Sequence, residues 1–237
     1  MNEQATDKEL YFNMTTIFFF YVPSIFEILV LILNLLAYVF LILTGNKLKH
    51  EPNEFKYFQF FVMSGILLFL WKIVFLFIPQ IDVHLPTSSE IILGFNYNLF
   101  KDFITFLFLL ISYGLFFTTI GVTNMKLSGK YVLFFGILQI IHSFMLFLIN
   151  TMLNRAIFSG YSTYISFIGL YYIISWFLRI IWIISILILL TYSYKINQKY
   201  LSYTCILLMT TTILDVVFGF LASFLFNTYG IALNYNF

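Results

Sequence analysis

Six long apolar stretches, separated by short polar loops, constrain this chain more than any other feature. Each has about 20 or more residues with few charges, the length that an α-helix needs to cross the hydrocarbon core of a bilayer. Isolated strands cannot do so, because lipid would leave their backbone groups unpaired. The predicted spans cover residues 16–43, 57–78, 99–122, 131–153, 163–193 and 203–226.

The composition agrees with a surface that faces lipid. Charged residues make up 9% of the chain and hydrophobic residues 62%, whereas a soluble domain carries about 25% charged residues. We therefore predict an all-α fold, a single polytopic transmembrane helix bundle of six spans over residues 16–227. An extracellular amino-terminal segment (1–15) precedes it and a short carboxyl-terminal tail (228–237) follows it.

The charges of the loops predict the orientation in the membrane. Every second loop is basic, and these loops contain Lys47, Lys49, Lys56, Lys126, Lys130, Lys195 and Lys199. Basic loops stay in the cytoplasm, so both ends of the chain are expected outside the cell. The first residues lack the basic region of a cleaved signal peptide. We expect an integral, multi-pass protein of the plasma membrane with a retained first span.

Charged residues within the spans are the candidate functional residues, because such residues are costly in lipid and usually face the bundle interior or a cavity. They are Glu27, Lys72, Asp102, Arg179 and Asp215. Arg179 and Asp215 lie at comparable depths on adjacent antiparallel spans, which predicts a pair. Lys72 either reaches Glu27 or extends to the headgroups. We interpret all five as ligand-binding residues; the alternatives are pairs that only pin helices together, or an ion path.

The sequence lacks the patterns of known catalytic and metal sites. The histidines His50, His84 and His142 lie on different segments without metal-ligand spacing, and no P-loop or nucleophile motif occurs. The one cysteine excludes an intrachain disulfide. A net charge of +2 without a basic cluster excludes a nucleic-acid partner. We predict no enzyme, no catalytic residue, no metal and no cofactor.

Three stretches of the chain resemble nematode serpentine chemoreceptors, most closely the gamma-class group of seven-span receptors. They are Tyr21-Val22-Pro23-Ser24-Ile25, Glu54-Phe55-Lys56-Tyr57-Phe58 and Thr119-Ile120-Gly121-Val122-Thr123-Asn124-Met125. The chain departs from the family in having Asn124 where the family often has arginine. Under this resemblance, its six predicted spans would correspond to a seven-span receptor fold that lacks its last helix.

The resemblance implies a chemosensory G-protein-coupled receptor. A small external ligand would bind in the outer half of the helix bundle, and a heterotrimeric G protein would contact the inner face, where the loop lysines lie. Membrane lipid would surround the spans. The alternative is a six-span transporter or channel subunit with Arg179 and Asp215 along its path, which predicts water-accessible residues on both sides of these charges.

Overall fold

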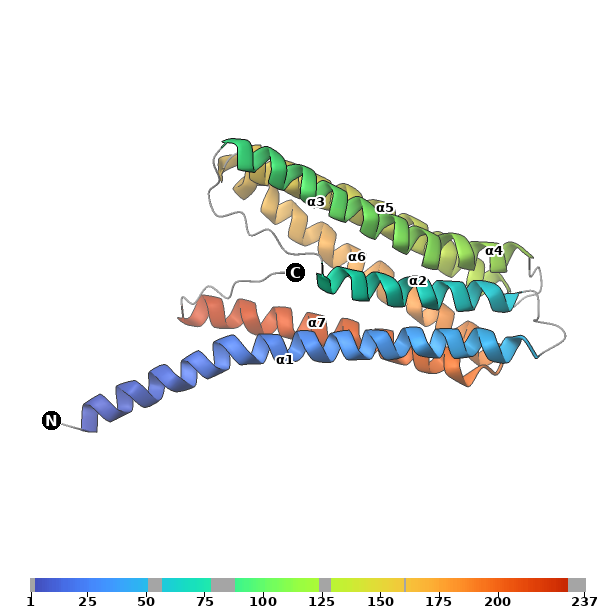
Figure 1. Cartoon of the computed structure of the whole chain (residues 1–237), viewed down its shortest axis with the longest axis horizontal. Helices are drawn as coiled ribbons and strands as arrows, with labels where there is room; N and C mark the ends of the chain where they lie inside the picture. Colours follow the sequence, from blue (N-terminus) through green and yellow to red (C-terminus); the bar gives the residue numbers. More distant parts are fainter. Residues whose placement is uncertain (1–2, 51–56, 78–87, 124–128, 160, 230–237) are drawn as a thin grey trace.

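A computed structural model of the chain describes residues 3–50, 57–77, 88–123, 129–159 and 161–229. Its helices are α1 (Glu3–Leu48), α2 (Phe58–Phe77), α3 (Ser88–Leu109), the π-helix η2 (Leu110–Leu115), α4 (Phe116–Thr123), α5 (Gly129–Ser159), α6 (Tyr161–Lys195) and α7 (Lys199–Tyr229). Because α3, η2 and α4 follow one another without a break, they form one long rod (Figure 1). The described chain therefore consists of six helical rods.

Five of these rods contain a stretch that is long and apolar enough to cross a membrane. The stretches are Ile25–Leu48, Tyr97–Thr123, Gly129–Ala156, Phe167–Lys195 and Lys199–Phe220. In α2 the described apolar part is shorter, Gln59–Val74. The prediction of an all-α, polytopic transmembrane bundle is confirmed, and the chain is an integral, multi-pass membrane protein.

Five of the six rods extend beyond the spans predicted for them, and the longest extensions are at the start of α1, which begins at Glu3 rather than at residue 16, and at the start of α3. α3 begins at Ser88 rather than at residue 99, because its first turn is polar and a hydropathy criterion leaves it out. α6 runs without a break from Tyr161 to Lys195. The predicted loop residues 51–56, 78–87 and 124–128, including Asn124, lie outside the described residues.

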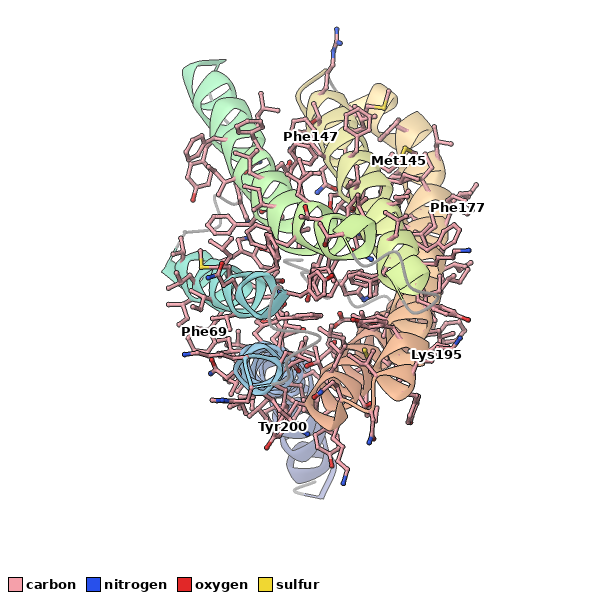
Figure 2. The ribbon with its side chains drawn as sticks, turned by 90° about the vertical axis from the view of Figure 1, so that its right-hand side faces the viewer. Phe69, Met145, Phe147, Phe177, Lys195 and Tyr200 are labelled. Atoms are coloured by element: carbon pink, nitrogen blue, oxygen red, sulfur yellow. The ribbon has the colours of Figure 1, made fainter. Side chains whose placement is uncertain are left out.

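The rods close into a ring. α1 contacts both α2 and α7, α2 contacts the rod of α3, η2 and α4, that rod contacts α5, and α6 links α5 to α7. Figure 2 looks onto one end of the bundle and shows the helices around a common interior filled by side chains. The first and last described helices are therefore neighbours in space.

The bundle is tightly packed only in one half, which we call the packed half; there α1, α4 and α6 end and α2, α5 and α7 begin. Toward the other half, α1 and α7 diverge from α3 and α5 (Figure 1). Most fully buried side chains belong to the packed half, among them Leu41, Phe61, Phe117, Phe135, Ile186 and Leu201. Aromatic rings interlock there, with the Phe117 and Phe135 centroids 4.8 Å apart. Since lipid is as apolar as these side chains, such close packing must hold the helices together.

The π-helix η2 lies where the third rod enters the packed half. In a π-helix, hydrogen bonds run from residue i to i+5, so the regular pattern of carbonyl partners is interrupted. The Ser64 hydroxyl of α2 donates a buried hydrogen bond of 2.8 Å to the backbone carbonyl oxygen of Ser112. A side chain of a neighbouring helix thus supplies a partner to the irregular segment, and this bond ties α2 to the third rod.

Candidate functional site

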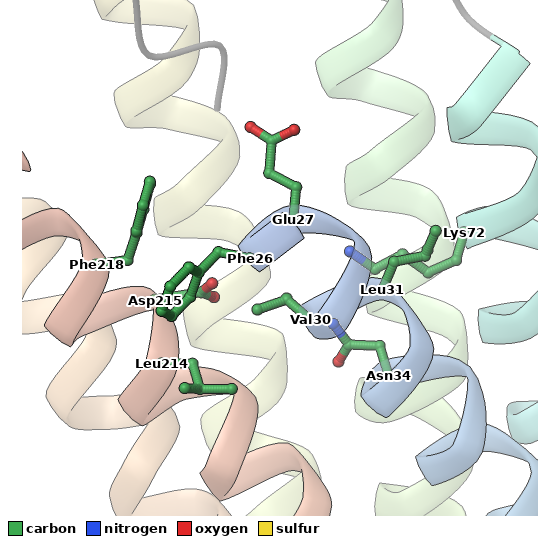
Figure 3. Close-up of a pocket in the computed structure, with 9 residues that line it drawn as sticks. All are labelled: Phe26, Glu27, Val30, Leu31, Asn34, Lys72, Leu214, Asp215 and Phe218. Carbon is green, nitrogen blue, oxygen red and sulfur yellow. The ribbon is translucent and has the colours of Figure 1, made fainter. Parts of the chain in front are cut away.

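A cavity of about 220 Å³ lies between α1, α2 and α7. It is drawn in Figure 3. Its lining combines charged, amide and apolar groups: Phe26, Glu27, Val30, Leu31, Asn34, Lys72, Leu214, Asp215 and Phe218. Three of the five candidate residues identified in the sequence (Glu27, Lys72 and Asp215) therefore meet in one place, although they come from three helices far apart in the chain.

Helical spacing explains why these residues share the cavity. Residues three and four positions apart lie on one face of a helix, and Glu27, Leu31 and Asn34 follow that spacing on α1. Leu214 and Phe218 do the same on α7. Lys72 lies in the last part of α2. The cavity thus lies beyond the packed half, where α1 and α7 separate from α3 and α5.

Asp215 is the centre of the charges around the cavity. Two positive charges, those of Lys72 and Arg179, are within electrostatic reach of its carboxylate. The Lys72 ammonium also lies 4.7 Å from the ring centroid of Trp71, where an aromatic face attracts a cation. Asp215 is thus an acidic residue within electrostatic reach of Lys72, whereas the sequence suggested Glu27 or the headgroups.

Arg179 lies at the level of Asp215, as its position in the sequence predicts. The Trp182 indole Nε1–H of α6 donates a hydrogen bond of 3.0 Å to Thr212 Oγ1 of α7. Arg179 precedes Trp182 by three residues and Asp215 follows Thr212 by three. Because α6 and α7 are antiparallel, both residues lie on the same side of this bond and at a similar depth. Arg179 does not line the cavity, and its guanidinium lies 5.4 Å from the Trp176 ring centroid. Its positive charge favours the charged form of Asp215 from outside the cavity.

Glu27 differs from the other charged residues of the cavity. Its side chain is exposed, and Figure 3 shows the carboxylate pointing away from Lys72. Within the part of the chain that the structure describes, no hydrogen bond or ion pair is formed by this carboxylate. It is a negative charge available to a molecule that enters the cavity.

Asp102 lies apart from the cavity. Its carboxylate accepts hydrogen bonds from two amides of α5, at 2.7 Å from Asn154 Nδ2 and 3.4 Å from Asn150 Nδ2. These amides are four residues apart, so they lie on one face of α5 and can both donate to the same carboxylate of α3. The contact joins two helices. Sequence reasoning missed both asparagines, although their spacing on an apolar span was a usable signal.

A second set of polar side chains crosses the bundle interior near Trp182. Buried Gln139 of α5 hydrogen-bonds to Ser185 of α6, and the Trp182 bond continues this connection to α7. The His142 ring lies 5.6 Å from the Trp182 ring, so the half-buried His142 packs against Trp182. Among the described residues, no group of three His, Cys, Asp or Glu side chains is arranged to hold a metal ion.

No protein-family model, curated protein or solved structure matches this chain. Its fold class and its place in the membrane therefore follow from its own helices. The functional argument rests on the cavity between α1, α2 and α7 and on the charges around it.

Proposed function

We propose that this membrane protein is a chemoreceptor-like receptor that binds a small external ligand in the cavity between α1, α2 and α7. The observation that carries the proposal is the meeting of Glu27, Lys72 and Asp215 at a cavity outside the packed half. Charges within a membrane are costly and are usually kept for a function. The amino-terminal resemblance to serpentine chemoreceptors supports the same assignment.

The proposed orientation has the cavity facing the outside. Exposed lysines lie at the ends of the helices in the packed half, among them Lys47, Lys130, Lys195 and Lys199, and basic segments stay on the cytoplasmic side. The ligand would then enter from outside between α1 and α7. Both helices continue into the packed half, so a ligand that favours one spacing of α1 and α7 shifts the population of arrangements at the inner face.

A heterotrimeric G protein is the partner that we propose for the inner face, on the strength of the resemblance. Replacing Lys47 and Lys199 with glutamine should weaken recruitment of purified G protein to the receptor in nanodiscs. Lys195 gives a matched control, because its ammonium donates to the Tyr131 hydroxyl at 2.8 Å and is already engaged within the protein. Equal loss with the Lys195→Gln control would point to a general charge effect.

Thiol accessibility tests the proposed binding site. In a Cys205→Ala background, which removes the buried native thiol, Leu214→Cys puts a thiol in the cavity. The adjacent Ile213→Cys gives the control, because Ile213 is 54% exposed on the lipid-facing surface. We expect a membrane-impermeant thiol reagent added outside the cell to label position 214 and not position 213. Absence of labelling at position 214 from outside would contradict the proposal.

A transporter is the second candidate function, because buried polar side chains continue from Asp215 into the packed half. On α7 these are Ser202, Thr204, Thr211 and Thr212. A transport path would make such positions accessible from the cytoplasmic side as well. Labelling of Thr204→Cys from the inside, together with labelling of Leu214→Cys from the outside, would favour transport. A receptor predicts labelling from the outside alone.

A further inference from the structure

We infer that the cavity between α1, α2 and α7 takes an organic cation, namely a primary ammonium on a compact apolar body, and that Glu27 holds the ammonium. This inference rests on the proposed function, because it assigns the ligand class of the same site. It follows from three features of the described residues: the pairing of the charges, the volume of the cavity and the rings that line it.

The lining of the cavity carries more negative than positive charge. It contains two carboxylates, Glu27 and Asp215, and one ammonium, that of Lys72, which also lies over the Trp71 ring. Of the two carboxylates, that of Glu27 belongs to an exposed side chain and forms no hydrogen bond or ion pair within the described residues. A charge within a membrane bundle calls for a partner of opposite sign. The group that completes this cavity is therefore a cation placed at Glu27.

The size of the cavity limits the rest of the ligand. A protein cavity of about 150 Å³ holds one benzene ring, and this cavity has about 220 Å³. It therefore has room for one ring and a short chain. Drug-sized ligands occupy pockets of about 300–1,000 Å³, so they are too large for it.

The lining favours an aromatic body for the ligand. The rings of Phe26 and Phe218 are stacked, with centroids 5.1 Å apart and planes inclined by 27°. Val30 and Leu31 add aliphatic surface one turn further along α1. Another ring can pack against this surface while its ammonium stays near Glu27. Figure 3 shows the two phenylalanines close to Asp215.

Three compounds of nearly equal size separate the charge from the shape of the ligand. Benzylamine is a cation at neutral pH, benzyl alcohol is neutral and benzoate is an anion. Binding of each to the full chain in nanodiscs is measured by isothermal titration calorimetry. We expect benzylamine to bind about tenfold or more tightly than benzyl alcohol, since a hydrogen bond to a charged group has that effect. Benzoate should bind more weakly than either.

Variants then identify the group that holds the cation. Glu27→Gln keeps the shape of the side chain and should weaken benzylamine binding about tenfold or more, with little effect on benzyl alcohol. Asp102→Asn is the matched control, because it makes the same acid-to-amide change outside the cavity. It should leave the affinity for benzylamine unchanged. Unfolding transitions of both variants show that the comparison concerns folded protein.

Several results would overturn the inference. Equal binding of benzylamine and benzyl alcohol would mean that charge does not matter. Tighter binding of benzoate, lost in Lys72→Gln, would assign an anion to the cavity. Absence of binding by all three compounds would also refute this ligand class. In each case thiol labelling at position 214 separately decides whether the proposed external site exists, so the two proposals fail independently.

Discussion

The contact between α4 and α5 gives a sharp test of how this bundle is held together. A Cβ added at Gly121 would lie 2.4 Å from the Leu133 backbone nitrogen, and one added at Gly136 would lie 2.5 Å from the Thr118 backbone nitrogen. Carbon atoms in favourable contact are about 3.5–4.0 Å apart. Because backbone atoms cannot rotate away, Gly121→Ala must push α4 and α5 apart by about 1 Å, the shortfall in that contact.

The expected cost follows from what the separation loosens. A gap of about 0.5–1 Å forfeits a quarter to a half of each dispersion contact, and the Phe117–Phe135 ring pair lies in this interface. Overpacking of this kind costs up to about 3 kcal/mol. Alanine is a better helix former than glycine by about 1 kcal/mol. We therefore expect Gly121→Ala to lower the free energy of unfolding by about 2 kcal/mol.

Gly169 provides the matched control, because a Cβ there would meet nothing within 4 Å. Gly169→Ala should gain up to about 1 kcal/mol from helix propensity. Unfolding in mixed micelles with increasing SDS, followed by circular dichroism, measures both variants. If Gly121→Ala were as stable as Gly169→Ala, close backbone contact would not hold these helices. The double variant Gly121→Ala/Gly136→Ala should cost less than the sum of the single variants, because both push the same two helices apart.

Three further predictions concern polar contacts between helices, and the same SDS titration measures them. Ser64→Ala leaves the carbonyl of η2 without its partner from α2, so it should cost about 1–3 kcal/mol; unchanged stability would mean that η2 forms without this bond. Trp182→Phe removes the indole bond to α7 and should cost about 0.6–1.7 kcal/mol, the range for such bonds in membranes; a larger loss would indicate a repacked core. In double-mutant cycles, coupling should be larger for Lys72 with Asp215 than for Arg179 with Asp215. The reverse order would contradict the electrostatic arrangement around the cavity.

The fold was predictable to the extent that lipid dictates it. A bilayer requires helices of a certain length and apolar composition, so hydropathy alone located the rods of the bundle. It could not locate the start of α3 at Ser88, since polar first turns have no hydropathy signal. Nor could it predict η2, because the π-helix depends on tertiary contacts such as the bond from Ser64.

The charged residues of the candidate site could be identified in the sequence, but their neighbours in space could not. Depth along the spans was enough to place Arg179 level with Asp215, because α6 and α7 are joined by a short connection and run antiparallel. Placing Lys72 near Asp215 required the knowledge that α1 lies between α2 and α7 in the ring. The periodicity of a single helix does not contain that information. Asp215 lies within electrostatic reach of Lys72, and the Glu27 carboxylate forms no hydrogen bond or ion pair among the described residues. The unpaired Glu27 carboxylate, which most limits the ligand, therefore depends on which helices are neighbours. Charge type alone would have paired Glu27 with Lys72, and the cavity would then have had no group to bind a ligand.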